Sequence, residues 1–432
     1  MTALRFGVNY TPRKDWFYSW LEPDFDEIRR DLDAIASLGL DHVRIFPFWP
    51  ILQPNRTLIR PRALADVRTL VRLAGEAGLD ASVDVIQGHM SSYDFVPAWL
   101  TSWHATNMFT DAGAVKAQAD LARALHDAVA DLPNYLGLTL GNEVNQFSGD
   151  PHPAPMRASS EDAGNWIRTL LDAVPAGGRA LRLHAEYDAV WYLDGHPFLP
   201  THAARLGDLT AIHSWIFNGT AQRYGGMAAE SVRHGEYLIE LARAFATDPG
   251  RPVWLQEIGA PLNCLDAAEA PAFCEQAVRH AADSPALWGV TWWCSHDVDR
   301  RLADFPELEY SLGLFDADGK AKPIGRAFAA VAEELRRRAV APAPRREAVV
   351  VAVDDADVPV RRADLAPGGA AFTAWMDLAR RGRRPAVVTS RTAGSADDLA
   401  ARGVEAVHEP DATGVSAYSA VSDGSALTTG TT

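Results

Sequence analysis

Short apolar segments alternate with longer amphipathic segments along most of the chain. The first apolar segment, 6–10, precedes a stretch in which apolar residues from Phe25 to Ile35 recur at helical spacing. Gly39 stands where that helix is expected to end. The same alternation continues to about Arg338, and the other apolar segments are 42–49, 79–88, 135–145, 180–187, 209–217, 252–260 and 286–294. The pattern therefore predicts eight strand–helix units.

Eight such units with nearly continuous apolar strands indicate a parallel sheet covered by helices. A closed (β/α)₈ barrel is the natural form of this repeat, and such barrels have a typical length of about 250 residues. An open doubly wound sheet is the alternative. It is disfavoured because no glycine-rich phosphate loop follows the first strand.

The character of the sequence changes after Arg338. VAPAPRRE resembles a linker, and the segments that follow predict a small α/β unit with helices near 370–380 and 396–402. We expect a catalytic barrel over 1–340, a C-terminal appendage over 341–410, and a disordered tail over 411–432 that is rich in Ser, Thr, Gly and Ala. The appendage carries no catalytic motif, so packing or oligomerisation is its expected role.

Charge and composition limit the partners. The formal net charge is −15, from 41 basic and 56 acidic residues, which disfavours nucleic acid. No apolar run is long enough to cross a membrane, and the N-terminal residues show no signal peptide, so we expect a cytoplasmic protein. The three cysteines lack metal-ligand spacing, and no metal or other cofactor is expected. A homo-oligomer stays open.

Polar residues gather at the ends of the expected strands, where the active site of a (β/α)₈ barrel lies. Two glutamates stand out, because Glu143 closes LGLTLGNE and Glu257 closes PVWLQE. One buried glutamate paired with a nearby arginine would be an ordinary ion pair. Two at the same mouth are better explained as the carboxylate pair of a glycosidase. The other candidates are Arg44, His89, Asn142, His213, Trp215, Trp292, Trp293, His296 and Asp297.

Asn-Glu at the end of the fourth strand and Glu at the end of the seventh resemble clan A glycoside hydrolases, and within that clan family 5, over about residues 5–338. The resemblance implies retention of configuration, with Glu143 as acid/base and Glu257 as nucleophile. It also implies that Asn142 binds the sugar 2-hydroxyl and that Arg44 orients the nucleophile. His89 and His213 would line the subsite of the cleaved sugar, and Trp293 would form its floor. Core packing remains an alternative for the tryptophans and for His213.

One triplet departs from the family pattern. Members typically show His-x-Tyr at the end of the sixth strand, where the tyrosine hydroxyl binds the nucleophile. Here the triplet is His213-Ser214-Trp215. Another group must replace the hydroxyl, or the nucleophile is tuned differently, and Tyr187 is a candidate for the replacement.

Two loop segments, QGHMSSYDFVPAWL and VTWWCSHDVD, resemble the exo-β-mannosidases of subfamily 18. That resemblance implies a small oligosaccharide substrate such as mannosyl-N-acetylglucosamine. The segments 147–160 and 296–310 are candidates for closing one end of the cleft. Four alternatives stay open: an endo-β-1,4-mannanase or glucanase, a transglycosidase, a non-hydrolytic sugar-binding barrel, and a metal-dependent hydrolase using His89, His213 and Asp297.

Overall fold

The computed structural model describes residues 4–104, 106–338 and 342–410. The expected boundary near residue 340 and the expected disordered tail therefore lie outside the described residues. Within them, no helix combines the length and the apolar character that a bilayer span requires.

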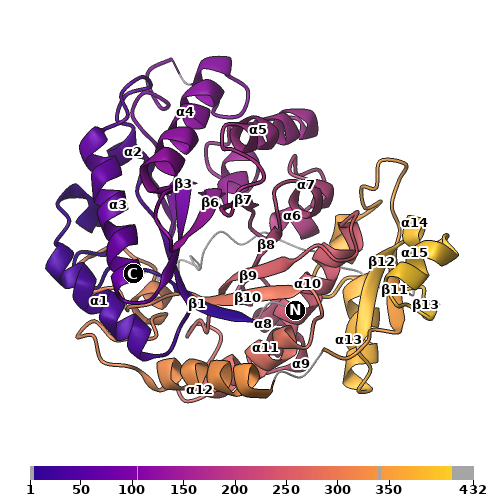
Figure 1. The fold of residues 1–432 in the computed structure, drawn as a ribbon. Helices are drawn as coiled ribbons and strands as arrows, with labels where there is room; N and C mark the ends of the chain where they lie inside the picture. The colour runs from indigo at the N-terminus through magenta and orange to yellow at the C-terminus, as the bar shows by residue number, and fades with distance from the viewer. Residues whose placement is uncertain (1–3, 105, 339–341, 411–432) are drawn as a thin grey trace, which may run out of the picture.

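Eight parallel strands form the barrel that the alternating pattern predicts (Figure 1). They are β1 (Arg5–Asn9), β2 (His42–Ile45), β3 (Asp80–Ile86), β6 (Tyr135–Asn142), β7 (Leu181–Ala185), β8 (Thr210–Ser214), β9 (Val253–Ile258) and β10 (Leu287–Trp292). Hydrogen-bonded neighbours follow the order β7-β6-β3-β2-β1-β10-β9-β8. The two end strands, β7 and β8, are also in contact, so the ring closes. The fold class expected from the sequence is confirmed.

A long helix follows most strands and covers the outside of the ring (Figure 1). Local sequence sets the helix ends: the Asp24 side chain accepts a hydrogen bond from the Glu27 amide, and Gly39 takes a left-handed φ of 71° after the last turn. The covering helices are α1 (Phe25–Ser37), α3 (Pro61–Glu76), α4 (Ala112–Val129), α5 (Ser160–Asp172), α7 (Pro200–Arg205), α10 (His234–Phe245), α11 (Ala270–Ala282) and α12 (Pro323–Arg338).

Short elements interrupt the loops that follow the strands, and these loops surround the mouth of the barrel. They are η1 (Trp16–Leu21), α2 (Trp49–Leu52), β4 (His89–Met90), β5 (Tyr93–Asp94), η2 (Val144–Ser148), α6 (Ala189–Tyr192), α8 (Thr220–Tyr224), α9 (Ala229–Val232) and η3 (Glu307–Ser311). Loops at this end carry the functional residues of such barrels, so they are the first place to look for a site.

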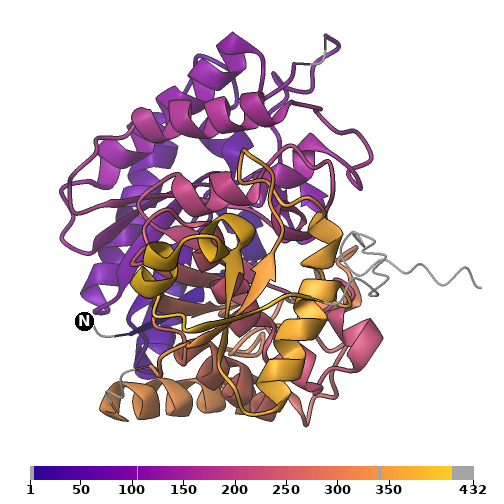
Figure 2. The ribbon, with the colours of Figure 1, turned by 90° about the vertical axis from the view of Figure 1, so that its right-hand side faces the viewer.

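The C-terminal appendage is a three-stranded parallel sheet with short helices. It contains β11 (Glu347–Val351), η4 (Arg362–Asp364), α13 (Ala370–Arg380), β12 (Pro385–Thr389), α14 (Ser390–Ala393), α15 (Ala396–Ala401) and β13 (Ala406–His408), in the strand order β12-β11-β13. Figures 1 and 2 show it against the outside of the barrel, beside α10.

The appendage shares one hydrophobic core with the barrel. Tyr237 of α10 is fully buried, contacts the rings of Phe372 and Trp375, and donates a 2.8 Å hydrogen bond to the Leu365 carbonyl. The expected linker takes part as well, because Arg345 is buried and forms ion pairs with Glu236 and Glu240 of α10. This segment is thus a docking contact rather than a solvated connection.

Candidate active site

Arg44 holds the centre of the site, inside the barrel. Its guanidinium donates two hydrogen bonds to Asp84, at 2.8 and 2.7 Å, and one to Glu257, at 2.8 Å. It also donates to the side-chain oxygens of Asn142, at 2.8 Å, and Asn9, at 3.3 Å. Because the arginine is fully buried and each of these hydrogen bonds goes to an oxygen, the guanidinium is fixed in one orientation.

Asp84 is a site residue that the sequence did not reveal. Burial raises the pKa of this carboxyl, and the Arg44 guanidinium lowers it. The pair makes Arg44 a rigid support for the groups above it. The available signal was the one charged residue within the apolar run 81–86, which needs a buried partner.

Glu257 is the penultimate residue of β9 and lies almost fully buried. Its Oε1 accepts from Arg44, while its Oε2 lies 3.2 Å from the Trp215 indole nitrogen and 3.5 Å from His213 Nδ1. Burial is the largest influence on the pKa of Glu257 and raises it. The nearby Glu143 also raises this pKa, whereas His213 and Arg44 lower it. Such a carboxylate is oriented and poorly hydrated, as a nucleophile needs to be.

Trp215 occupies the place of the expected tyrosine and supplies its own donor. The indole N–H donates to Glu257 in place of a phenolic hydroxyl. The ring fits because residue 259 is glycine: a Cβ there would lie 2.7 Å from the Trp215 ring. Tyr187, the residue considered as the replacement, lines the same cavity. The departure from the family triplet thus keeps a hydrogen bond to Glu257.

This contact predicts a pH effect. The Trp215 donor stabilises the charged form of Glu257, so Trp215→Phe is expected to raise its pKa. The acidic limb of kcat/KM, which reports the free enzyme, reflects the pKa of Glu257, which burial already raises in the wild type, and should move up by about one pH unit in the variant. Phe217→Leu changes the ring packed on Trp215 without removing a donor, and should leave the limb in place. An unmoved limb in Trp215→Phe would contradict this role.

Glu143 follows β6 in a left-handed conformation, with φ 47° and ψ 34°. A non-glycine residue rarely adopts this conformation, and functional sites are where such strain is found. Its Oε2 accepts from Gln146 at 2.7 Å, and its Oε1 lies 2.7 Å from His213 Nδ1. One carboxylate oxygen of Glu143 and one of Glu257 lie within 4.8 Å of each other. This short separation suits a retaining pair, for which about 5–5.5 Å is usual, better than the 6.5–9.5 Å of an inverting pair.

His213 bridges the two glutamates. Burial lowers the pKa of its imidazole, which favours the neutral ring. Its Nε2 lies 3.4 Å from Gln256 Oε1, and Gln256 in turn donates to Thr139. When Nε2–H donates to Gln256, Nδ1 becomes an acceptor that faces Glu143. A neutral ring in this tautomer can accept a hydrogen bond from the protonated carboxyl of Glu143, which is the form that a catalytic acid needs.

The two glutamates open into one small cavity at the mouth of the barrel. His89 and Asn142 also line it, and Trp293 contributes an aromatic wall that packs edge-on against Phe46. Trp215 and Tyr187, both named from the sequence, line it too. The lining residues that the sequence did not single out are Met90, Ser91, Phe217, Asn218 and Glu309. Arg44 and His213 support the cavity through Glu257, Asn142 and Glu143. Eight of the eleven candidates named from the sequence are therefore brought together.

Asp297 is one of three exceptions, with Trp292 and His296. Its carboxylate accepts from the Gly313 amide at 2.8 Å and from Lys322 at 2.7 Å, and it does not line the cavity. The lysine lies 25 residues further along the chain, so this ion pair is invisible to local sequence reading. Trp292 and His296 are likewise core residues, packed on Phe328 and Phe315.

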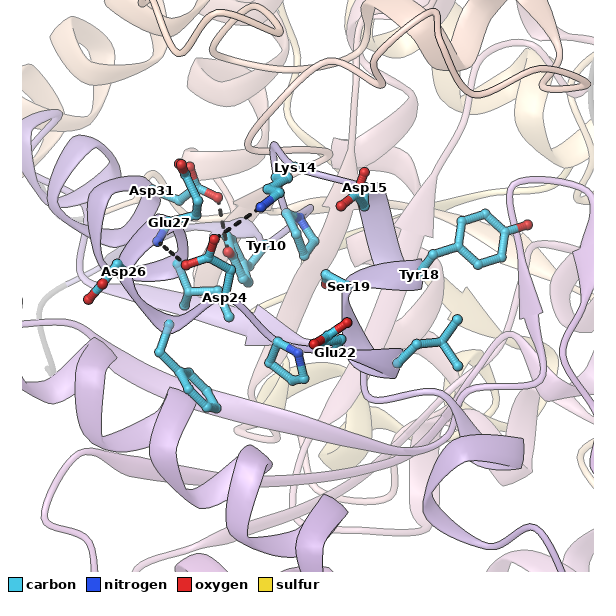
Figure 3. A pocket seen from close by; sticks show the side chains of 15 residues that line it. Tyr10, Lys14, Asp15, Tyr18, Ser19, Glu22, Asp24, Asp26, Glu27 and Asp31 are labelled. Atoms are coloured by element: carbon cyan, nitrogen blue, oxygen red, sulfur yellow. Dashed lines mark hydrogen bonds and ion pairs between the residues drawn. The ribbon is translucent and has the colours of Figure 1, made fainter.

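A larger hollow of about 660 Å³ lies beside the loop after β1 (Figure 3). Its lining includes six carboxylates, of which Asp24 pairs with Lys14 and Asp31 accepts from Tyr10. The hollow contains neither strand-end glutamate. The small cavity at Glu143 and Glu257 is therefore the candidate active site.

No protein-family model and no curated protein matches the chain, whereas solved structures do. A GH5_18 protein from Bifidobacterium longum subsp. infantis is 54% identical, with a TM-score of 0.93, covering 95% of this chain and 97% of that chain. A variant GH5_18 protein from Streptomyces cattleya, in complex with Manβ1-4GlcNAc, is 55% identical, with a TM-score of 0.93 and coverages of 94% and 99%.

A third similar structure is a variant GH5_18 protein from Bifidobacterium longum subsp. longum ATCC 55813, also in complex with Manβ1-4GlcNAc. It is 50% identical, with a TM-score of 0.95, and covers 97% of this chain and 99% of that chain. Identity at this level over nearly the full length of both chains establishes common family membership. The chain belongs to glycoside hydrolase family 5, subfamily 18.

Proposed function

We propose that the protein is a retaining exo-β-mannosidase that hydrolyses Manβ1-4GlcNAc to mannose and N-acetylglucosamine. The observation that carries the proposal is the pair Glu143 and Glu257, with carboxylate oxygens within 4.8 Å and a hydrogen-bond donor on each carboxylate. The substrate follows from the disaccharide bound by two relatives of 50–55% identity.

The geometry gives each glutamate a distinct role. Glu257, held by Arg44 and Trp215, attacks the anomeric carbon and forms a covalent α-mannosyl ester. Glu143 donates its proton to the departing oxygen and then removes a proton from the water that hydrolyses the ester. Its contact with His213 Nδ1 keeps the carboxyl oriented in both steps. Net retention results from the two displacements.

Asn142 and the walls of the cavity bind the sugar. Arg44 donates to the Asn142 side-chain oxygen, and the amide nitrogen, 3.5 Å from the His89 carbonyl, is the group that would donate to the 2-hydroxyl. His89 supplies a polar group, and the Trp293 ring offers a flat apolar surface to the pyranose.

Contacts between the loops support exo action. Ser91, in the loop after β3, donates to Glu309 of η3 at 2.9 Å, and both residues line the cavity. Asp94 in the same loop lies 3.0 Å from His152, which belongs to the loop after β6. These contacts between loops close the cavity on one side. An endo-enzyme would instead require a groove that is open at both ends.

Glu143, His213 and Glu257 also form the kind of group that can hold a metal ion. Hydrogen bonds within the protein already use the ligand atoms, and the Arg44 cation lies against Glu257, which disfavours a second cation there. We therefore propose metal-independent chemistry, with hydrolysis that withstands a chelator such as EDTA.

The substrate panel that tests the proposal contains aryl β-mannoside, β-glucoside and β-galactoside, Manβ1-4GlcNAc, and polymeric mannan. We expect selective release of mannose from the two small β-mannosides. Preference for the polymer would identify an endo-enzyme, and product longer than the substrate would identify a transglycosidase. Bound but intact disaccharide after long incubation would favour a sugar-binding barrel. The cytoplasmic location and any homo-oligomer stay predictions from the sequence.

A further inference from the structure

Arg362 of the C-terminal appendage binds a loop of the barrel. The residue is 3% exposed, and its guanidinium donates to four main-chain carbonyls within 190–198. The acceptors, with their distances from the guanidinium nitrogens, are Val190 (3.5 Å), Leu193 (3.2 Å), His196 (3.0 Å) and Phe198 (2.9 Å). The Arg362 amide also donates to Asp194 at 2.5 Å. One buried cation thus fixes the whole loop after α6.

His196 carries this contact toward the cavity. Burial lowers the pKa of His196 to about 4, so the ring is neutral at ordinary pH. Its Nδ1 accepts from the Phe198 amide at 3.2 Å, which leaves the proton on Nε2. That nitrogen donates to the Asn145 carbonyl at 3.2 Å and lies 3.5 Å from the Ser148 hydroxyl.

Asn145 completes the connection. Its side chain accepts from the Tyr187 amide at 2.9 Å and donates to the Tyr187 carbonyl at 3.3 Å, so it holds that backbone at both polar groups. Tyr187 lines the cavity, and Asn145 lies two residues after Glu143. Because Glu143 has a left-handed backbone, it keeps that conformation only while its neighbours hold it there.

We propose that Arg362 is a positioning residue for Glu143, and that the appendage is a working part of the active site. The inference rests on the proposed function, since it assigns Glu143 as the acid. Arg362 acts through the 190–198 loop, His196 and Asn145, and touches neither substrate nor cavity.

Arg345 offers a matched control. It is equally buried, belongs to the same end of the chain, and docks it onto the barrel through Glu236 and Glu240, while it also donates to the Pro385 carbonyl within the appendage. These contacts lie on α10 and β12 rather than on the loops at the mouth. If the arginines only held the appendage in place, removal of either would have the same catalytic effect.

The experiment compares Arg362→Met with Arg345→Met in the full chain, well below the Tm of each. The readout is kcat/KM for Manβ1-4GlcNAc, whose leaving group needs an acid, and for 2,4-dinitrophenyl β-mannoside, whose leaving group does not. We expect Arg362→Met to lower kcat/KM on the disaccharide by about 10- to 100-fold, because a small displacement of a catalytic group has an effect of this size. On the aryl mannoside we expect a loss in kcat/KM of less than about threefold. Arg345→Met should leave the ratio of the two values unchanged.

His196→Leu interrupts the same connection without touching the appendage, and should change the ratio in the same direction. The ratio of kcat/KM on the disaccharide to kcat/KM on the aryl mannoside decides the matter. If Arg362→Met or His196→Leu folds and this ratio is unchanged, the inference is overturned. An equal change of the ratio in Arg345→Met would also overturn it. A wild-type protein inactive on both substrates would instead overturn the proposed function.

Discussion

Glu257→Ala is expected to lower kcat/KM for Manβ1-4GlcNAc by more than about 10⁴-fold, beyond the usual contribution of an acid–base group. The variant lacks the atom that attacks the anomeric carbon, and no other described carboxylate is held by Arg44 and Trp215 together in the cavity. The fold should survive, because Arg44 retains both hydrogen bonds to Asp84.

Azide gives this prediction a chemical signature. The anion is small enough for the space that Glu257 leaves beside Arg44, and it attacks the face that the carboxylate attacked. The product expected from an activated aryl β-mannoside is therefore α-mannosyl azide. Asp297→Asn is the comparison variant, because it alters a carboxylate held by Lys322 outside the cavity, and we expect a loss below about tenfold. A comparable loss in both variants, or β-mannosyl azide from Glu257→Ala, would contradict the assignment.

Glu143→Ala is expected to lose about 10²- to 10⁴-fold in kcat/KM on the disaccharide and far less on 2,4-dinitrophenyl β-mannoside. The dinitrophenolate departs without protonation, so removal of the acid leaves formation of the mannosyl ester nearly intact. Hydrolysis of the ester lacks its base, however, and an initial burst of phenolate should precede a slow steady state.

Azide should accelerate that slow phase and yield β-mannosyl azide, because it replaces water in the second displacement. The opposite anomers from the two alanine variants are a paired result that a purely structural role for either glutamate does not produce. Equal losses on both leaving groups would mean that Glu143 is not the acid.

Periodicity along the chain was sufficient for the barrel and for the two glutamates. Each strand is a short apolar segment, and a carboxylate at its end is costly to bury without a partner. Such a residue therefore stands out in the sequence alone. Glu143 and Glu257 meet because the ends of parallel strands converge on one face of the closed sheet. The fold was therefore within reach of the periodicity, whereas the family came from the resemblance of the Asn142-Glu143 and Glu257 motifs to known glycoside hydrolases.

Contacts between segments that are distant in the chain could not be predicted from the sequence. Asp84 lies 40 residues from Arg44, and its place in an apolar run indicates only that it needs a buried partner, not that the partner is Arg44. Asp297 has the position of a site residue, yet Lys322 draws its carboxylate away from the cavity. Trp215 replaces a tyrosine at a point where only the three-dimensional arrangement shows that the indole N–H reaches Glu257.

The appendage illustrates the same limit. Arg345 stands in a segment rich in proline and arginine that is typical of an exposed linker, and the sequence around Arg362 has no distinguishing feature. Both are buried, because carbonyls and carboxylates from segments more than 100 residues away surround them. An arginine buried by remote partners has the same local sequence as an exposed one, so the pattern carries no signal for it.

The most direct test of the account follows hydrolysis of Manβ1-4GlcNAc by proton NMR, with enough enzyme to outpace mutarotation. We predict that β-mannose is the first mannose anomer to appear, together with free N-acetylglucosamine in equal amount, and that α-mannose follows only as the two anomers equilibrate. Appearance of α-mannose first, or an intact disaccharide, would contradict a retaining β-mannosidase built on Glu143 and Glu257.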